Sequence, residues 1–253
     1  MLDLIDTGRM PGGRPAWEIL MPEEAPGGSG VFVVCDERGE VAGAVRCAVR
    51  PADGAGLIVW LHSREDLEVT AALIALAGAH LADRPVLYAC TGPATATGIP
   101  GLPVTHRPVT AWALAAAGFM PASAQRYFLR DLADPALPPP AYPLAEVTSL
   151  TRPPGWRLNL TDAAGRPLAD ATLHTPTPAT GHMALLAALT VRPGQRRRGI
   201  GSHLLAQALH HAHTQGASRI TTTVPGDDTA AARLLEGAGF LLLDTLTVYR
   251  RHP

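Results

Sequence analysis

The stretch from Arg192 to Ser202 has the composition of a phosphate-binding loop. It reads Arg-Pro-Gly-Gln-Arg-Arg-Arg-Gly-Ile-Gly-Ser, with four arginines within seven residues and no acidic residue. An apolar strand ends at Val191, Pro193 blocks its continuation, and a Leu-rich helix follows the second glycine. A helix N-terminus presents unpaired N–H groups and a positive dipole end, and glycines let an anion approach them. The residues therefore predict a strand–loop–helix site for phosphate.

The elements around this loop predict a mixed α/β domain, because hydrophobic periodicity switches between strand and helix spacing. Gly216 stands where a C-cap glycine would end the helix that follows the loop. The order is β-β-β-α-β-α-β. The expected elements are a hairpin over 156–174, a strand over 183–191, a helix over 199–214, a strand over 219–224, a helix over 228–237 and a last strand ending near 250.

The first half of the chain repeats this order. An Asp-x-x-Gly hairpin turn occurs at Asp36 and again at Asp162, and Ala-Gly-Phe precedes the last strand of each half. Five prolines between residues 132 and 146 exclude a helix or a central strand there. We therefore expect domains at 1–133 and 147–253, joined by a Pro-rich linker at 134–146.

The motif Val-x-Pro-x-x-Arg-x-x-Gly-x-Gly at Val191–Gly201 resembles motif A of the GNAT N-acetyltransferase superfamily. The segment from Asp228 to Phe240 is similar to motif B, and the resemblance covers roughly Trp156 to the C-terminus. It implies an α/β fold of two tandem GNAT-like domains, each a mixed, mostly antiparallel sheet flanked by helices. It also implies binding of acetyl-CoA as co-substrate. The residues that it assigns to the cofactor are Leu189, Thr190, Val191, Arg196, Arg197, Arg198, Gly199, Ile200, Gly201, Ser202 and Asp228.

The activity that the resemblance implies is N-acetyltransfer from acetyl-CoA to the amine of a small molecule or to a protein N-terminus. The usual acid and base of the family are missing, since Leu235 stands where many members have Tyr and the strand before the loop has no carboxylate. His174 and His182 flank that strand and are candidates for the base. A non-catalytic acyl-CoA binding or sensing protein is the alternative, while a purely structural module would leave the loop unexplained.

The first half departs further from the family. After its matching strand the chain reads His62-Ser-Arg64-Glu65-Asp66, without glycine and with two carboxylates where phosphate would lie. Their charge would repel coenzyme A. We expect a degenerate domain that does not bind the cofactor.

The composition excludes several classes of protein. With 253 residues, 47% of them hydrophobic, the chain can bury a core, and a net charge of −1 gives no reason to expect nucleic-acid binding. The N-terminus lacks a signal-peptide pattern and the longest apolar run is too short to span a bilayer, so we expect a soluble, cytoplasmic protein. Four histidines between positions 203 and 213 have no further ligands in view, and we expect no metal site. Two fused halves favour a monomer.

Overall fold

The computed structural model describes residues 29–36, 38–132, 143–176 and 180–252. The chain divides into two compact units, the first made of residues 1–125 and 244–253 and the second of residues 126–243. Two strands, β6 (Met120–Asp131) and β12 (Leu241–Arg251), run from one unit into the other. The greater part of the expected linker lies outside the described residues, and the expected domain limits stay a prediction.

The first unit is a sheet covered on one face by two helices. Its elements are β1 (Gly30–Cys35), β2 (Val41–Val49), β3 (Gly56–His62), α3 (Leu67–His80), β4 (Leu87–Ala89), β5 (Leu102–Pro103) and α4 (Pro108–Ala116). Strands β1, β2 and β3 are antiparallel neighbours, while β3 and β4 run parallel. The core gathers side chains from β2, β3 and both helices, such as Val45, Ile58, Leu73 and Leu114.

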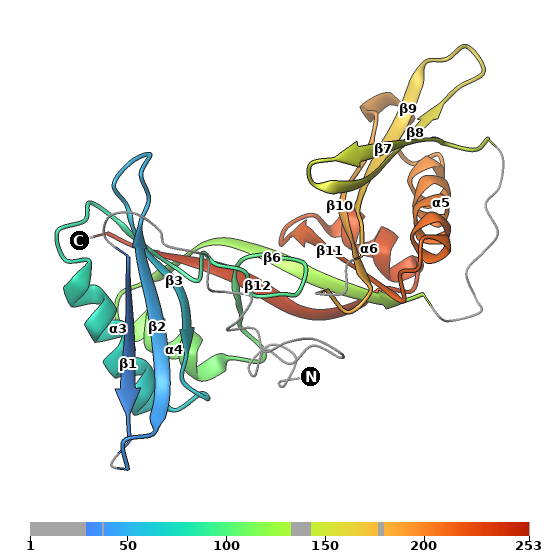
Figure 1. Ribbon diagram of the computed structural model, residues 1–253. Helices are drawn as coiled ribbons and strands as arrows, with labels where there is room; N and C mark the ends of the chain where they lie inside the picture. Colours follow the sequence, from blue (N-terminus) through green and yellow to red (C-terminus); the bar gives the residue numbers. More distant parts are fainter. Residues whose placement is uncertain (1–28, 37, 133–142, 177–179, 253) are drawn as a thin grey trace. The chain divides into compact units, whose positions relative to one another are not determined.

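The second unit follows the same plan around one long helix (Figure 1). Its elements are β7 (Glu146–Thr151), β8 (Pro154–Thr161), β9 (Pro167–His174), β10 (Met183–Val191), the short 3₁₀ helix η2 (Pro193–Gln195), α5 (Ile200–Thr214), β11 (Arg219–Pro225) and α6 (Thr229–Gly237). Strands β7 to β10 are antiparallel neighbours, and β10 runs parallel to β11. Helix α5 packs through Leu204, Leu205 and Ala208 on the inward side chains of β8 and β9.

These elements confirm the expected mixed α/β order in both halves. The helix expected over 199–214 is Ile200–Thr214, and the strand expected over 183–191 is β10. The short strand β5 and the edge strand β7 were not expected. Strand β5 has only two residues and β7 is exposed along most of its length, so neither carries a clear hydrophobic period.

The last strand, β12, pairs with strands of the first unit. Residues Tyr249–Arg251 of β12 pair antiparallel with Leu87–Ala89 of β4, and residues 246–247 pair with β5. Tyr249 is 6% exposed and belongs to the core of the first unit. The C-terminal residues therefore complete the sheet of the N-terminal unit.

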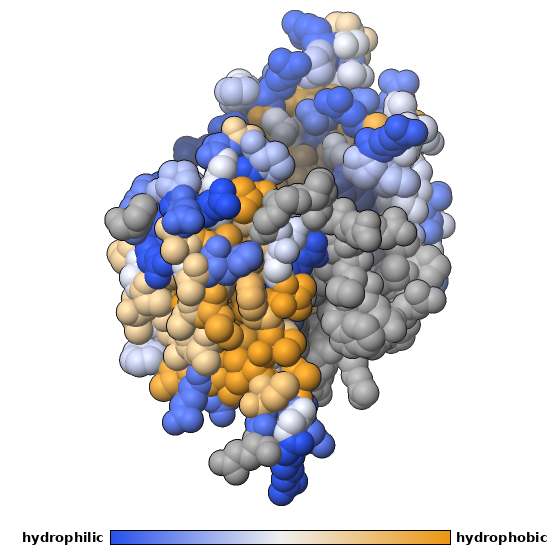
Figure 2. Space-filling view, turned by 60° about the vertical axis from the view of Figure 1, so that its left-hand side comes forward, coloured by the Kyte–Doolittle hydropathy of each residue, from blue (hydrophilic) through white to orange (hydrophobic). Residues whose placement is uncertain are grey.

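The first unit exposes several large apolar side chains. Trp112 on α4 is 61% exposed and Leu76 on α3 is 41% exposed, and Val31 and Val33 project from the edge strand β1. Figure 2 shows hydrophobic residues gathered on one side of the molecule. In the described part of the chain, no helix has the length and apolar character needed to cross a membrane.

Candidate cofactor site

The predicted phosphate loop joins β10 to α5 with a backbone that only some residues tolerate. Strand β10 ends at Val191, η2 forms a tight turn, and the N-cap of α5 is Gly199 with φ of 76°. Arg197 also has a positive φ, 59°. Glycine adopts this left-handed conformation without the steric cost that a Cβ atom adds, which explains its place at the start of the helix.

Among the residues that the structure describes, no side chain caps the N-terminus of α5. Its N-cap makes no side-chain hydrogen bond, and its first turn contains no acidic residue. The other α-helices in the described ranges differ: Asp66 caps α3, Asp228 caps α6, and Glu65 accepts from the first turn of α4. Unpaired N–H groups and the helix dipole favour negative charge at a helix N-terminus. Carboxylates of the chain occupy this position on the other three helices, whereas on α5 it is open to an external anion.

The arginines of the loop surround this helix end. Arg196, Arg197 and Arg198 are exposed, the Nε of Arg196 donates to the carbonyl of Val191 at 3.2 Å, and Arg198 donates to Gln195 at 2.7 Å. None of the three forms an ion pair with another described residue. Their uncompensated charge adds to the positive potential of the helix end.

Gly201 lies on the first turn of α5 between two apolar side chains. A Cβ atom built there would lie 3.4 Å from Leu234 of α6 and 3.4 Å from Val191. Ile200 is partly buried against the core, whereas Ser202 is exposed and its hydroxyl is not used as the helix cap. A larger residue at 201 would therefore reach into the space beside the loop.

Strands β10 and β11 separate next to this loop. They pair only over Met183–Leu185 with Arg219–Thr221, although both strands continue. Beyond that point the hydroxyl of Thr222 donates to the carbonyl of Leu186 at 2.8 Å. Within the described ranges, the edge of β10 that faces β11 thus has no strand partner over residues 187–191, the stretch that includes Leu189, Thr190 and Val191. A polar chain could pair with that backbone edge and continue to the helix N-terminus.

Two other assigned positions lie on α6. The carboxylate of Asp228 accepts a hydrogen bond from the N–H of Ala231 at 2.8 Å, so it acts as the N-cap of this helix. Leu235 is 4% exposed and packs in the core of the second unit. The position that the resemblance matched to a Tyr is therefore a core position in this chain.

The two candidate bases lie at the far end of β10 from the loop. His174 is the last residue of β9 and pairs in register with Leu185, six residues before Val191, or about 20 Å along the strand. Its side chain is half-buried, and burial lowers its pKa. His182 is exposed, precedes β10, and accepts from the N–H of Ser218 through its carbonyl. His174 is thus suited to stay neutral near pH 7.

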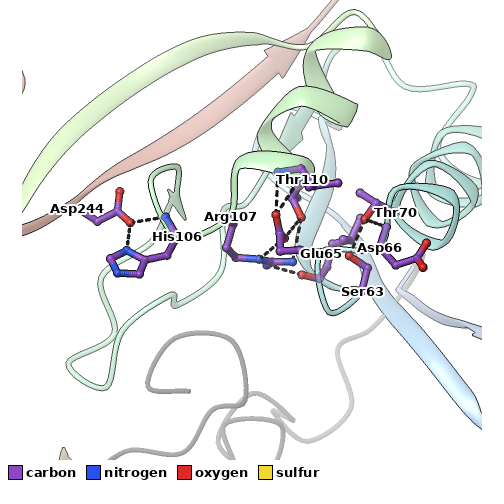
Figure 3. Close-up of polar contacts among 10 residues, drawn as sticks. Ser63, Glu65, Asp66, Thr70, His106, Arg107, Thr110 and Asp244 are labelled. Atoms are coloured by element: carbon purple, nitrogen blue, oxygen red, sulfur yellow. Dashed lines mark hydrogen bonds and ion pairs between the residues drawn. The ribbon is translucent and has the colours of Figure 1, made fainter. Parts of the chain in front are cut away.

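In the first unit, carboxylates of the loop after β3 fill the N-termini of both helices, shown in Figure 3. The carboxylate of Glu65 accepts from the backbone N–H groups of Val109 and Thr110 at 2.8 and 3.0 Å, and from the Nε of Arg107 at 3.0 Å. The side chain of Arg107 is buried, with 6% exposure, and that of Glu65 is partly buried, with 15% exposure. Asp66 caps α3, the helix that corresponds to α5, by accepting from the N–H of Val69 at 3.0 Å.

The backbone edge of β3 is also occupied. Strands β3 and β4 pair over Gly56–Ile58 and then separate, as β10 and β11 do. Here, however, the N–H of Gly92 donates to the carbonyl of Val59 at 2.7 Å, and Arg107 donates to the carbonyl of Leu61 at 2.7 Å. The first unit repeats the architecture but closes it with internal groups.

The sequence pattern identified Glu65 and Asp66 but not their partners. Arg107 is 42 residues away along the chain and precedes α4 without a recognisable motif. Asp244 was missed for the same reason: this fully buried carboxylate accepts from the N–H groups of Thr105 and His106, and it forms a 2.5 Å contact with Nδ1 of His106 (Figure 3). No local signal links residues so far apart.

Comparison with known proteins gives a family for the second half of the chain. Residues 126–240 match the acetyltransferase (GNAT) family. This segment is a GNAT domain. A search of curated proteins finds no match to the chain. The family assignment made from the phosphate loop is confirmed, and the match starts at β6, upstream of the motifs in the sequence.

Solved structures show that the GNAT fold extends over the whole chain. A GCN5-related N-acetyltransferase from Sphaerobacter thermophilus has a TM-score of 0.62 at 15% identity, covering 94% of this chain and 83% of that one. A tandem GNAT protein from the clavulanic acid biosynthesis pathway has a TM-score of 0.60 at 18% identity, covering 99% and 93%. A protein from Kribbella flavida has 0.55 at 17%, covering 83% and 88%. The expected fold of two tandem GNAT-like domains is confirmed.

Proposed function

We propose that this protein is an N-acetyltransferase that moves an acetyl group from acetyl-CoA to an amine. The observation that carries the proposal is the N-terminus of α5, which no carboxylate of the described residues caps and which is flanked by three exposed arginines that form no ion pair within the described part of the chain. GNAT proteins in general use acyl-CoA and an amine. The choice of acetyl, and of a small molecule or a protein N-terminus as acceptor, is our proposal.

The cofactor would be held by backbone and side-chain groups of the second unit. The N–H groups of the first turn of α5, together with Arg196 to Arg198, would hold its phosphates. The open edge of β10 from Leu189 to Val191 would pair with the amides of its pantetheine arm. A backbone N–H of this edge would stabilise the oxyanion that forms when an amine attacks the thioester carbonyl. The protein would contribute mainly by positioning the amine against the thioester and by polarising the thioester carbonyl.

Proton transfer depends on a group that titrates near neutral pH. We propose His174 as the base, because its lowered pKa keeps the ring neutral and because it lies on the strand next to β10. His182 stays the second candidate. An amine that arrives neutral would need neither histidine. Variants that lack His174 or His182 would then retain activity with an amine of low pKa.

The first unit is proposed not to bind acetyl-CoA. The support is chemical: Asp66 already caps the N-terminus of α3, the helix that corresponds to α5, and Arg107 and Gly92 already donate to carbonyls of β3. A phosphate at that helix end would have to displace the carboxylate of Asp66 and would lie in the same loop as the carboxylate of Glu65, whose like charge would repel it.

A non-catalytic acyl-CoA binding protein is the second candidate. It is favoured by the burial of Leu235 and by the lack of a carboxylate on β10. Turnover separates it from the enzyme.

Calorimetric titration with acetyl-CoA, beside free coenzyme A, tests the proposal. We expect one site per chain, followed by release of thiol when an accepted amine is added. Two sites would show that the first unit also binds, and no heat of binding at any concentration would refute the cofactor assignment. Binding without turnover across a broad amine panel would favour the sensing protein.

A further inference from the structure

In the second unit, the face of the sheet that points away from α5 carries polar side chains. Because side chains alternate along a strand, the residues that follow or precede the core positions Leu158 and Ala171 lie on the opposite face. On β8 these are Arg157 and Asn159, and on β9 the nearest is Asp170, which pairs in register with Thr190 of β10.

These side chains surround a small pocket of about 110 Å³. Its polar lining consists of Arg157, Asn159, Asp170, Thr190 and Arg192. The volume suits one small polar group, such as a carboxylate, rather than a whole acceptor molecule. The pocket is therefore a site for one end of a ligand.

The charges around the pocket favour an anion. Arg157 and Asp170 form one contact of 3.5 Å, with side chains 53% and 35% exposed, so this ion pair is loose. Arg192 forms no ion pair with a described residue. Two guanidinium groups against one carboxylate leave a positive charge, and guanidinium groups recognise carboxylates with paired hydrogen bonds.

Arg192 is thereby distinguished from the other arginines of the loop. It lines the pocket together with Thr190, whereas Val191 between them packs against the core beside α5. Arg196 to Arg198 instead follow η2 and flank the N-terminus of α5. The loop thus serves two surfaces, one on each face of the sheet.

The pocket lies next to the open edge of β10. Thr190 both lines the pocket and belongs to the stretch 187–191 that β11 leaves unpaired. A ligand anchored there can reach the backbone of residue 187, three residues back, over about 10 Å. Groups on the two faces can meet only where β10 and β11 separate.

We propose that this pocket binds the anionic end of the acceptor, and that the acceptor is a small amine carrying a carboxylate several bonds from its amino group. The inference rests on the proposed acetyl-CoA site, because that site fixes where the amine must go. It narrows the acceptor from any amine to an amino carboxylate. Asn159 and Thr190 supply the neutral hydrogen-bond partners, and Asp170 limits the net charge.

The test compares 6-aminohexanoate with its uncharged primary amide. Binding of each probe to the full chain is measured by NMR saturation transfer and calorimetry, with and without saturating coenzyme A. We expect the carboxylate to bind about tenfold more tightly than the amide, as one charge-assisted contact of about 1.4 kcal/mol would give. Arg192→Gln and Arg157→Gln should each reduce the carboxylate to the level of the amide.

Arg233→Gln on α6 is the matched control and should change neither probe, since Arg233 is exposed and lines no part of the pocket. Coenzyme A affinity should stay the same in Arg157→Gln and Arg233→Gln, which lie outside the phosphate loop. Equal binding of the two probes, no binding of the carboxylate, or unchanged binding in both pocket variants would overturn the inference. If the unaltered chain does not bind coenzyme A, that result counts against the proposed function. The titration of the two probes without coenzyme A still tests the pocket in that case.

Discussion

At the scale of single residues, Gly201 tests the proposed phosphate site. It lies on the first turn of α5, and a Cβ there would meet Leu234 and Val191. Gly201→Glu adds both bulk and negative charge beside N–H groups that would hold phosphate. We expect acetyl-CoA affinity to fall by at least about 100-fold, or some 3 kcal/mol, in a calorimetric titration.

The control for this variant is in the first unit. Arg64→Glu places the same charge at the corresponding loop, beside Glu65, and should leave acetyl-CoA affinity unchanged. A Gly201→Glu protein that folds and binds as tightly as the unaltered chain would refute the loop assignment.

His62 makes a residue-scale prediction about pH. It ends β3, its Nδ1 is buried without a partner, and burial, with a smaller effect from Arg107, lowers its pKa from 6.5 to about 4. The unfolded chain therefore binds this proton more readily between pH 6.5 and 4, and stability falls as pH falls through that window. The free energy of unfolding should drop by about 3 kcal/mol from this group. His62→Gln should flatten the dependence measured by urea unfolding, whereas His252→Gln at an exposed position should not.

At the scale of elements, the N-termini of the helices separate the two units. Helices α3, α4 and α6 are capped by carboxylates of the chain, and only α5 among the described α-helices leaves its first N–H groups to an external anion. The same strand–loop–helix arrangement thus stabilises the fold in one unit and is available for binding in the other.

Glu65→Ala tests this difference. It removes the acceptor from the first turn of α4 and leaves the guanidinium of Arg107 buried beside two polar contacts. We expect a loss of about 3 to 5 kcal/mol in the free energy of unfolding, as for a broken buried ion pair. Acetyl-CoA affinity at a temperature where the variant is folded should not change.

Asp66→Ala supplies the matched comparison, because it removes an ordinary N-cap from an exposed position. Its cost should be about 1 kcal/mol. Equal losses in the free energy of unfolding of the two variants would show that the pair of Glu65 and Arg107 stabilises the fold no more than an ordinary helix cap.

At the scale of the whole molecule, the first unit depends on the end of the chain. Residues 246–251 pair with β4 and β5, and Asp244 accepts backbone hydrogen bonds from Thr105 and His106. A chain that ends after Leu243 should therefore lose the cooperative thermal transition of the first unit. A chain that lacks only His252 and Pro253, beyond β12, should melt normally. A cooperative transition in the shorter chain, measured by circular dichroism, would contradict this dependence.

The sequence by itself determined the parts of this protein that depend on local spacing. The period of the apolar residues gives most strands and helices to within two residues. The loop from Arg192 to Ser202 indicates the family, and its phosphate site stays a prediction. These features are local because a helix N-terminus, a glycine with positive φ and a strand end are each set by a few neighbouring residues.

Only the tertiary structure decided which distant groups meet. It pairs β12 with β4, joins Glu65 to Arg107 across 42 positions, and places Arg192 on the face of the sheet opposite α5. It also buries Leu235 in the core. These contacts depend on strand pairing and packing between segments far apart in the chain. No local pattern records them, because many partners would satisfy the same hydrogen bonds and the same apolar surface.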